Sequence, residues 1–315
     1  MKQRQLAMVI DLNRCIGCQT CTVACKSMWT DRAGREYMYW NNVETHPGKG
    51  YPKKWYKHGG GFDSSGELKE GISPKSKDYG IPWDYNYNEI KESKEFKPLS
   101  KVEYGVNWEE DVSYGDNELN SYFFYIPRLC NHCTNPACIS ACENDAIFKR
   151  EKDGIVLVDL DKCDGSRFCL SACPYSKIYF NPKLSKSEKC NFCYPLIERG
   201  LSPACVEQCV GNARFIGYLD DDGGSVYKLV KEYKVALPLK ADFNTSPNIY
   251  YIPPYKAPLG FDKNGDISEN SQRLPMDYLE FMFGENVYDA IDLINQEIER
   301  KNSSELIAIL SGEYS

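Results

Sequence analysis

The sequence predicts an α+β protein built from two small cysteine-bearing modules, one nested in the other. It also predicts a long aromatic loop insertion and a C-terminal helical extension. Three observations support this: fifteen cysteines fall into four groups, the groups repeat one another in pairs, and the remaining segments differ from them in composition. A chain of 315 residues can bury a substantial core and form one to three domains.

The first and third cysteine groups are copies of one motif. The first group has the spacing C-x2-C-x2-C-x3-C and consists of Cys15, Cys18, Cys21 and Cys25. The third group keeps this spacing and consists of Cys163, Cys169 and Cys173. Residues 10–25 and 158–173 align without gaps, and both end in Ala-Cys. Ser166 therefore stands where the alignment expects a cysteine.

The second and fourth groups are copies of another motif, Cys-Asn-x-Cys followed by Pro-Ala-Cys-x3-Cys. The second group consists of Cys130, Cys133, Cys138 and Cys142. The fourth group has a longer central loop and consists of Cys190, Cys193, Cys205 and Cys209. The four groups together account for all fifteen cysteines, so none is left over.

This spacing indicates iron–sulfur clusters. A C-x2-C-x2-C loop binds three corners of a cubane, and in two-cluster ferredoxins the fourth cysteine binds the other cluster. Groups two and three are separated by twenty residues, which predict a hairpin with strands at 146–148 and 155–158 and a turn at Asp153-Gly154. We therefore expect a ferredoxin-like module at 126–185.

By exclusion, groups one and four form an outer ferredoxin-like module, made of residues 1–29 and 186–222, that surrounds the nested one. The strand expected at Leu6–Asp11 should pair with the strand expected at 214–219 and close the outer module.

In a crossed arrangement, the fourth cysteine of each group binds the cluster of its paired group. This crossing of ligands gives four hypothetical ligand sets. Three sets would each hold a [4Fe-4S] cluster: Cys15, Cys18, Cys21 and Cys209; Cys25, Cys190, Cys193 and Cys205; and Cys130, Cys133, Cys138 and Cys173. The fourth set would hold a [3Fe-4S] cluster with Ser166 at the vacant position: Cys142, Cys163 and Cys169. Ligation of a fourth iron by Ser166 is the alternative, which we disfavour because a hydroxyl keeps its proton far more tightly than a thiol.

Zinc sites and disulfides fit the cysteine pattern less well. Zinc prefers two separated pairs of ligands, and disulfides are typical of short secreted chains. His132 lies between two cysteines, but four thiolates already surround that cluster, so we expect a packed or sulfur-adjacent side chain.

The run at 262–266 resembles a calcium loop, but its glycine is misplaced and position twelve is Arg273, so a plain turn is preferred. No nucleophile–base constellation is present, and we expect no catalytic site on this chain.

The net charge of −7 disfavours nucleic acid as a partner. No apolar run is long enough for a membrane helix, and the N-terminus shows neither a signal-peptide core nor a twin-arginine pair. We therefore expect a soluble chain that has no export signal of its own.

The insertion at 30–125 lacks cysteine and, with Trp29 just before it, holds every tryptophan: Trp29, Trp40, Trp55, Trp83 and Trp108. Aromatic side chains favour protein interfaces, so we expect a partner surface there, with Trp40 and Trp55 as candidates, although simple coverage of the clusters is the alternative. The extension at 223–315 predicts two helices. One spans Met276–Phe283, and the second aligns Val287, Ile291, Ile294 and Ile298 on one face.

The sequence resembles the iron–sulfur beta subunits of the type II dimethyl-sulfoxide-reductase family of molybdenum enzymes. The resemblance rests on Asp-Leu-Asn-Arg-Cys-Ile-Gly-Cys-Gln-Thr-Cys-Thr-Val-Ala-Cys at 11–25, Met-Tyr-Trp-Asn-Asn-Val-Glu-Thr at 38–45 and Asn-Ile-Tyr-Tyr-Ile-Pro-Pro at 248–254. Cys-Pro-Tyr at 173–175 and Lys-Cys-Asn-Phe-Cys-Tyr-Pro at 189–195 also match. The family includes nitrate reductase, nitrite oxidoreductase, selenate, chlorate and perchlorate reductases, and dimethylsulfide and ethylbenzene dehydrogenases.

The resemblance implies an electron-transfer subunit between a large bis-pterin molybdenum subunit and a haem b gamma subunit. It further implies a periplasmic complex exported by a twin-arginine signal on the large subunit, with the cytoplasmic face of the membrane as the alternative. Family members with a tryptophan at the position of Ser166 bind a three-iron cluster there. A free-standing multi-cluster ferredoxin is the second interpretation, but it leaves the insertion and the extension without a purpose.

Overall fold

The computed structural model describes residues 4–46, 60–62, 64, 68–70, 122–257, 260–261, 267–268, 273–300 and 304–312. Our expectations for Trp55 and for the turn at 262–266 lie outside these residues, as do Trp83 and Trp108.

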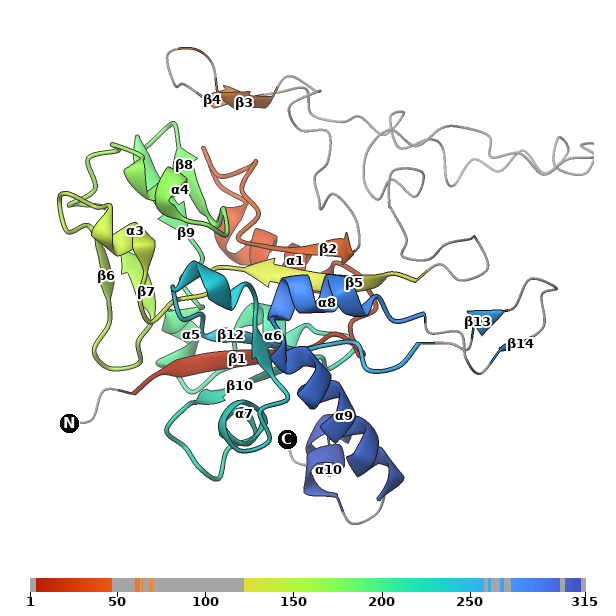
Figure 1. The fold of residues 1–315 in the computed structure, drawn as a ribbon. Coiled ribbons are helices and arrows are strands. Elements are labelled where there is room, and N and C mark those ends of the chain that lie inside the picture. Colours follow the sequence, from red (N-terminus) through yellow and green to blue (C-terminus); the bar gives the residue numbers. More distant parts are fainter. Residues whose placement is uncertain are drawn as a thin grey trace, which may run out of the picture.

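A four-stranded sheet lies at the centre of the described part (Figure 1). Its strand order is β10-β1-β12-β11, with β1 at Leu6–Asp11, β10 at Arg214–Tyr218, β12 at Ile249–Ile252 and β11 at Leu237–Pro238. The antiparallel pairing of β1 with β10, which the sequence predicts, is confirmed. On its other side β1 pairs with β12 in parallel. All six residues of β1 are buried, because this central strand is covered on both faces, and its apolar run fits that position.

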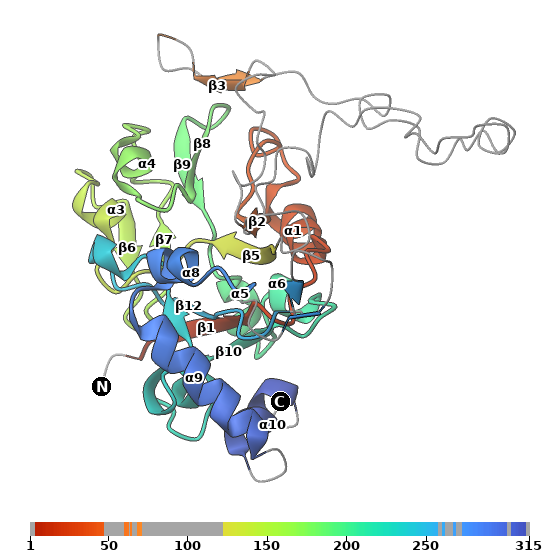
Figure 2. The ribbon, with the colours of Figure 1, turned by 45° about the vertical axis from the view of Figure 1, so that its right-hand side comes forward.

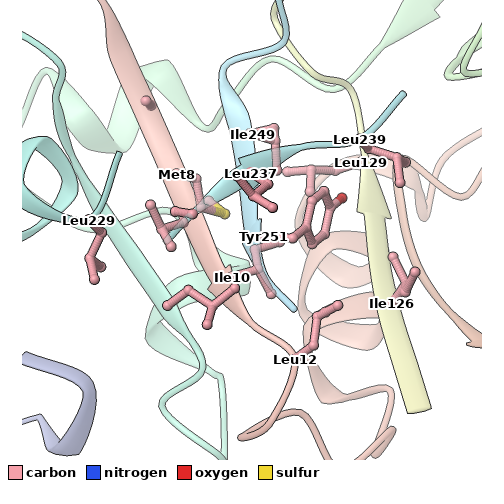
Figure 3. Close-up of a cluster of buried hydrophobic side chains, with 14 of the residues drawn as sticks. Met8, Ile10, Leu12, Ile126, Leu129, Leu229, Leu237, Leu239, Ile249 and Tyr251 are labelled. Atoms are coloured by element: carbon pink, nitrogen blue, oxygen red, sulfur yellow. The ribbon is translucent and has the colours of Figure 1, made fainter. Parts of the chain in front are cut away.

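The main hydrophobic core surrounds these strands (Figure 3). Met8 and Ile10 of β1 pack near Ile249 and Tyr251 of β12, and all four are at most 1% exposed. The Tyr251 hydroxyl donates a 2.9 Å hydrogen bond to the Pro127 carbonyl, so its one polar group is satisfied inside the core.

Two short hairpins form a lobe above this sheet (Figures 1 and 2). The first consists of β6 at Ile147–Lys149 and β7 at Val156–Val158, which confirms the predicted hairpin. The second consists of β8 at Ile178–Asn181 and β9 at Lys186–Lys189. Helix α3, at Ala137–Ser140, packs against helix α4, at Phe168–Ala172, in the same lobe.

The central sheet carries an equivalent pair of helices. Helix α1 at Thr20–Cys25, extended by a π-helical turn at Lys26–Thr30, packs against α6 at Ala204–Glu207. Helix α5 at Tyr194–Ile197 precedes α6. In sequence, β1 precedes the first cysteine group and β10 follows the fourth, whereas β6 and β7 lie between the second and third groups.

The ends of the predicted insertion belong to the folded body. Strand β2 at Asn41–His46 pairs with β5 at Phe124–Leu129 in antiparallel register, with Val43 opposite Pro127. Between them, β3 at Gly60–Phe62 pairs with β4 at Leu68–Glu70.

The C-terminal region is helical as expected, but it also contributes strands. Helix α8 spans Met276–Phe283, as predicted, and α9 spans Asn286–Glu299 with Val287, Ile291 and Ile294 buried. Helix α10 covers Glu305–Ser311. Before them lie α7 at Ser225–Tyr227, a π-helical turn at Lys228–Glu232, β11, a 3-10 turn at Ala241–Phe243, β12, and the pair β13 at Gly260–Phe261 and β14 at Ile267–Ser268.

The expectation of a helical extension at 223–315 is therefore incomplete. Strands β11 and β12 complete the central sheet, because the side of β1 not paired with β10 would otherwise leave its backbone unpaired in the core. In the part of the chain that the structure describes, no helix is both long and apolar enough to span a membrane.

Candidate iron–sulfur cluster sites

The structure brings the cysteines together in the sets that the crossing of ligands predicts. Three cavities are each lined by four cysteines. The Cys15 cavity is lined by Cys15, Cys18, Cys21 and Cys209. The Cys25 cavity is lined by Cys25, Cys190, Cys193 and Cys205. The Cys130 cavity is lined by Cys130, Cys133, Cys138 and Cys173.

The remaining three cysteines also lie together, and we call them the Cys163 site. Burial raises the pKa of the Cys169 thiol, and the nearby thiols of Cys163 and Cys142 raise it further. The Ser187 backbone N–H donates to Cys163 Sγ at 3.4 Å, and the Ser187 hydroxyl lies 3.4 Å from Cys169 Sγ.

Ser166 is exposed beside this site. Its backbone N–H donates a 3.0 Å hydrogen bond to Asp164 Oδ1, and its side chain also hydrogen-bonds to that carboxylate. These two bonds lower the pKa of Asp164. The hydroxyl of Ser166 therefore has an anionic partner on the protein itself, which competes with any role as a ligand.

The backbone of the first and third loops explains how the repeated motif wraps around a cavity. Gly17 and Gln19 adopt positive φ values of 69° and 61°, and the equivalent Gly165 and Arg167 adopt 82° and 68°. Glycine reaches this region without steric cost, so its presence before Cys18 and before Ser166 allows the chain to turn sharply at the same point.

The second and fourth loops also share a turn. His132 and Phe192, at the variable position of Cys-Asn-x-Cys, have φ values of 42° and 55°. Pro136 and Pro203 then end an extended segment, and helices α3 and α6 begin at the next residue. Each of these two helices carries a cysteine in its first turn, and these cysteines, Cys138 and Cys205, line a cavity.

Burial makes most of these thiols hard to ionise without a compensating positive charge. It raises the pKa of Cys133 and Cys138 to about 12 each, and that of Cys15 and Cys205 to about 11 each. Neighbouring thiols of the same set contribute to each of these rises. Four buried thiols around one cavity suit a thiophilic cationic group, because metal binding is what deprotonates such a set.

The thiols surround their cavities rather than one point. Among the described residues, no three histidine, cysteine or carboxylate side chains converge on the position of a single metal ion. The donor set, all thiol and arranged around a volume, fits an iron–sulfur cluster.

Arg214 is a buried cation between two of the cavities. Its guanidinium donates to Cys21 Sγ at 3.3 Å and to Asn41 Oδ1 at 2.9 Å. Burial alone would lower the pKa of Arg214, but the thiols of Cys205, Cys21 and Cys209 outweigh it and raise the pKa. Because Cys21 belongs to the Cys15 cavity and Cys205 to the Cys25 cavity, this one side chain faces both.

Lys177 has a similar place between the Cys25 and Cys130 cavities. Its ammonium group donates to Asn42 Oδ1. Burial lowers the pKa of Lys177 to about 7; Arg128 lowers it too, whereas Glu44 and the thiols of Cys190 and Cys130 act in the opposite direction. Neither Arg214 nor Lys177 was identified from the sequence, because nothing in the local pattern shows which lysine or arginine faces a cavity.

The helices that link the sites place them in a row. Cysteines four residues apart lie about one helical turn apart. Helix α1 carries Cys21 of the Cys15 cavity and Cys25 of the next cavity, and α3 starts the segment that carries Cys138 of the Cys130 cavity and Cys142 of the Cys163 site. The Cys130 thiol lies close enough to Cys190 of the Cys25 cavity to raise its pKa, which makes these two cavities neighbours. The order along the row is therefore the Cys15 cavity, the Cys25 cavity, the Cys130 cavity and the Cys163 site.

His132 lines the Cys130 cavity and is 1% exposed. Its Nδ1 accepts a 3.1 Å hydrogen bond from the Val156 N–H, and its ring meets the Phe192 ring edge-on at 4.9 Å between centroids. Burial, together with the charges of Lys189 and Lys149, holds the pKa of His132 well below its usual value. The side chain is thus a packed neutral imidazole, and the four thiols of the set line the cavity with it.

Trp40 differs from our expectation. It is 5% exposed and lines the Cys25 cavity, so the assignment of Trp40 to a partner surface is wrong. Trp29 lines the same cavity, stacked on Trp40 with 6.4 Å between ring centroids, and its Nε1 donates to Cys193 Sγ at 3.1 Å. Aromatic residues close to cysteine in sequence can cover a cluster, and composition alone does not separate that role from an interface.

Comparison with known proteins agrees with these cysteine sites. Residues 121–219 match the family described as 4Fe-4S dicluster domain, and residues 6–27 match the 4Fe-4S binding domain. The chain is 54% identical to dimethylsulfide dehydrogenase subunit beta of Rhodovulum sulfidophilum, with 99% of this chain and 97% of that protein covered. It is 51% identical to selenate reductase subunit beta of Thauera selenatis, with the same coverage. It is 52% identical to respiratory nitrate reductase subunit beta of Haloferax mediterranei, over 98% of this chain and 90% of that one.

Proposed function

The chain belongs to the family of iron–sulfur beta subunits of type II dimethyl-sulfoxide-reductase-family molybdenum enzymes, and we propose that it conducts electrons between a molybdopterin catalytic subunit and a second redox partner. It is an iron–sulfur electron-transfer subunit of an oxidoreductase complex, and substrate chemistry belongs to another subunit.

The observation that carries the proposal is the row of four cysteine sites. We assign one [4Fe-4S] cluster to each of the Cys15, Cys25 and Cys130 cavities and a [3Fe-4S] cluster to the Cys163 site. The grouping of four thiols around each cavity supports the first three assignments. The bonds between Ser166 and Asp164 support a vacant fourth corner at the last one.

The two halves of the row would be two ferredoxin-like modules. The pairing of β1 with β10, the hairpin of β6 and β7, and the packing of α1 on α6 and of α3 on α4 support this, and the order of the cysteine groups along the chain would nest the second module within the first.

When bound, iron–sulfur clusters supply one-electron redox chemistry. The protein residues hold these groups, exclude water and fix the charge around them. Arg214 places positive charge between the Cys15 and Cys25 cavities, which favours the reduced state of the sites on either side. Buried thiols and short separation along helices keep the row continuous.

The names of the relatives support a complex with a catalytic alpha subunit, which we expect to bind a bis-pterin molybdenum cofactor. We also propose a haem b gamma subunit as the second redox partner and a periplasmic location by co-export. A free-standing multi-cluster ferredoxin remains the competing function.

Iron analysis of the anaerobically purified complex tests the cluster assignment. Three four-iron groups and one three-iron group require about fifteen irons per chain, after subtraction of iron in partner subunits. A value of about sixteen without an oxidised three-iron signal in electron paramagnetic resonance would assign Ser166 as a ligand. A value of about eight would refute the four-cluster assignment.

Purification from the native source tests the partner. We expect a molybdenum-containing subunit to copurify in one-to-one ratio with this chain. Recovery of a stable monomer that holds all clusters without a partner would favour the ferredoxin instead.

A further inference from the structure

The wall of the Cys25 cavity contains the side-chain N–H donors of Trp29, Trp40, Asn41 and Asn191, and those of Trp40 and Asn41 are buried without an acceptor among the described residues. Trp29 Nε1 donates to Cys193 Sγ at 3.1 Å. Trp40 Nε1 and Asn41 Nδ2 are buried and have no hydrogen-bond partner in the part of the chain that the structure describes. Trp29, Trp40 and Asn41 line the cavity, together with its four cysteines.

These donors are held rigidly. Asn41 is 2% exposed, and its Oδ1 accepts a 2.9 Å hydrogen bond from Arg214 Nη2, which fixes the amide and turns Nδ2 away from that guanidinium. Trp40 is 5% exposed and stacks on Trp29 at an interplanar angle of 22°. Neither N–H can reach solvent by a small rotation of its side chain.

A buried N–H donor without an acceptor costs free energy, and folded proteins leave few of them. Two such donors beside one cavity indicate that the acceptors belong to whatever occupies it. A group bound by four cysteine thiolates offers sulfur atoms as those acceptors, whereas water in so apolar a cavity would find few partners.

We propose that Trp40 Nε1–H and Asn41 Nδ2–H donate hydrogen bonds to sulfur atoms of the cluster bound by Cys25, Cys190, Cys193 and Cys205, and that they raise its reduction potential. The proposal rests on the cluster assignment under the proposed function. Trp40 and Asn41 are positioning residues, which act on the potential and not on substrate.

The physical reason is the gain of charge on reduction. One added electron increases the negative charge on the sulfur atoms, and an N–H donor binds a more negative acceptor more strongly. Donors that are fixed in advance and shielded from water therefore stabilise the reduced state more than the oxidised state.

The test is Trp40→Phe in the intact purified complex, which keeps an aromatic ring in the wall and removes the N–H. Redox titration followed by electron paramagnetic resonance should show that the equilibrium constant for reduction of one site falls by about tenfold, a shift of about 59 mV for a one-electron couple. The potentials of the remaining sites should shift less, and the iron content should not change.

Tyr251→Phe provides the matched control. It also removes one buried hydrogen-bond donor, the hydroxyl bonded to the Pro127 carbonyl, but Tyr251 lines none of the three cysteine cavities. We expect no shift at the same site in this variant. An unchanged potential in Trp40→Phe, or an equal shift in both variants, would overturn the proposal.

If the Trp40→Phe variant does not assemble, a measurement on the unaltered complex tests the proposed hydrogen bonds instead. With indole nitrogens labelled as nitrogen-15, pulsed electron paramagnetic resonance of the reduced site should resolve two couplings, from Trp29 through Cys193 and from Trp40. One coupling or none would overturn the proposal. A native complex that lacks the iron for this site would refute the cluster assignment itself, which separates the two failures.

Discussion

The loops at 10–25 and 158–173 have the same backbone but different chemistry. Both turn at a glycine with positive φ, Gly17 and Gly165, and both continue with another left-handed residue before a short helix. At the position after the glycine, one loop has a cysteine that lines a cavity and the second has the exposed Ser166. The sharp turn therefore lies at the same place in both loops, although one of them has a serine in place of a cysteine.

The partners of the thiols also differ between the two loops. Cys21 and Cys169 occupy the same position in the repeat. Cys21 Sγ accepts a hydrogen bond from the buried Arg214 guanidinium at 3.3 Å, whereas Cys169 Sγ lies 3.4 Å from the Ser187 hydroxyl. The two equivalent thiols thus have a cationic and a neutral side-chain partner, which is one way in which a repeated motif can produce sites of different potential.

The largest expected effect is on the shared turn itself. A Cβ at Gly165 would lie 2.4 Å from the Ser185 carbonyl oxygen, which is backbone, and a positive φ adds about 1–2 kcal/mol for an L-residue. We expect Gly165→Ala to lose iron at the Cys163 site and to lower the free energy of unfolding by more than about 2 kcal/mol. Iron content and thermal unfolding of the complex measure this.

Gly17→Ala is the matched variant in the first loop. Its Cβ would approach the Tyr125 ring at 2.7 Å, and a side chain can move more easily than backbone. We expect a smaller loss of stability than in Gly165→Ala. The reverse order of the two variants would show that the two turns are not equivalent.

The second prediction concerns the missing ligand. Ser166→Cys restores the full C-x2-C-x2-C loop, so we expect one additional iron, loss of the oxidised three-iron signal and a lower potential at that site. Electron flow through the row should slow, while activity of the catalytic subunit with an artificial dye should persist. If iron content and spectrum equal those of the native complex, the site already holds four irons and our assignment of Ser166 is wrong.

The third prediction concerns the partners of Cys21 and Cys169. Removal of a buried cation that bonds to a thiolate should destabilise the reduced state, so Arg214→Gln should lower the equilibrium constant for reduction of the Cys15 site by roughly tenfold. Arg214→Lys keeps the charge and should have a weaker effect. Ser187→Ala should change the equilibrium constant for reduction of the Cys163 site by only roughly threefold, because it removes a neutral donor. Equal shifts from Arg214→Gln and Ser187→Ala would contradict the distinction between the two environments.

The smallest expected effect is that of Asp164→Asn. The amide accepts a hydrogen bond from the Ser166 hydroxyl less strongly than the carboxylate, which frees that oxygen. We expect the three-iron signal to persist, because a neutral hydroxyl remains a poor ligand for iron. Spectra of the variant with and without added ferrous iron check this, and conversion to a four-iron site would show that Asp164 is what keeps the corner vacant.

The sequence by itself determined the cysteine groups and their pairing, because ligand spacing and internal repeats are local properties of the chain. It also predicted the hairpin at β6 and β7 and the bounds of α8, because hydrophobic periodicity and turn residues are visible within a few positions. The pairing of β1 with β10 was predicted as well, from the order of the repeated cysteine groups along the chain.

Only the tertiary structure decided what surrounds each site. Arg214, Lys177 and Trp40 face the cavities because the strands and loops that carry them cross near the cysteines, and such contacts join residues more than a hundred positions apart, as between Arg214 and Cys21. The parallel strand β12 was also invisible in the sequence, since its role depends on the unpaired edge of β1. Burial and neighbouring charge set the properties of a cluster site, and both are properties of the packed chain rather than of any segment of it.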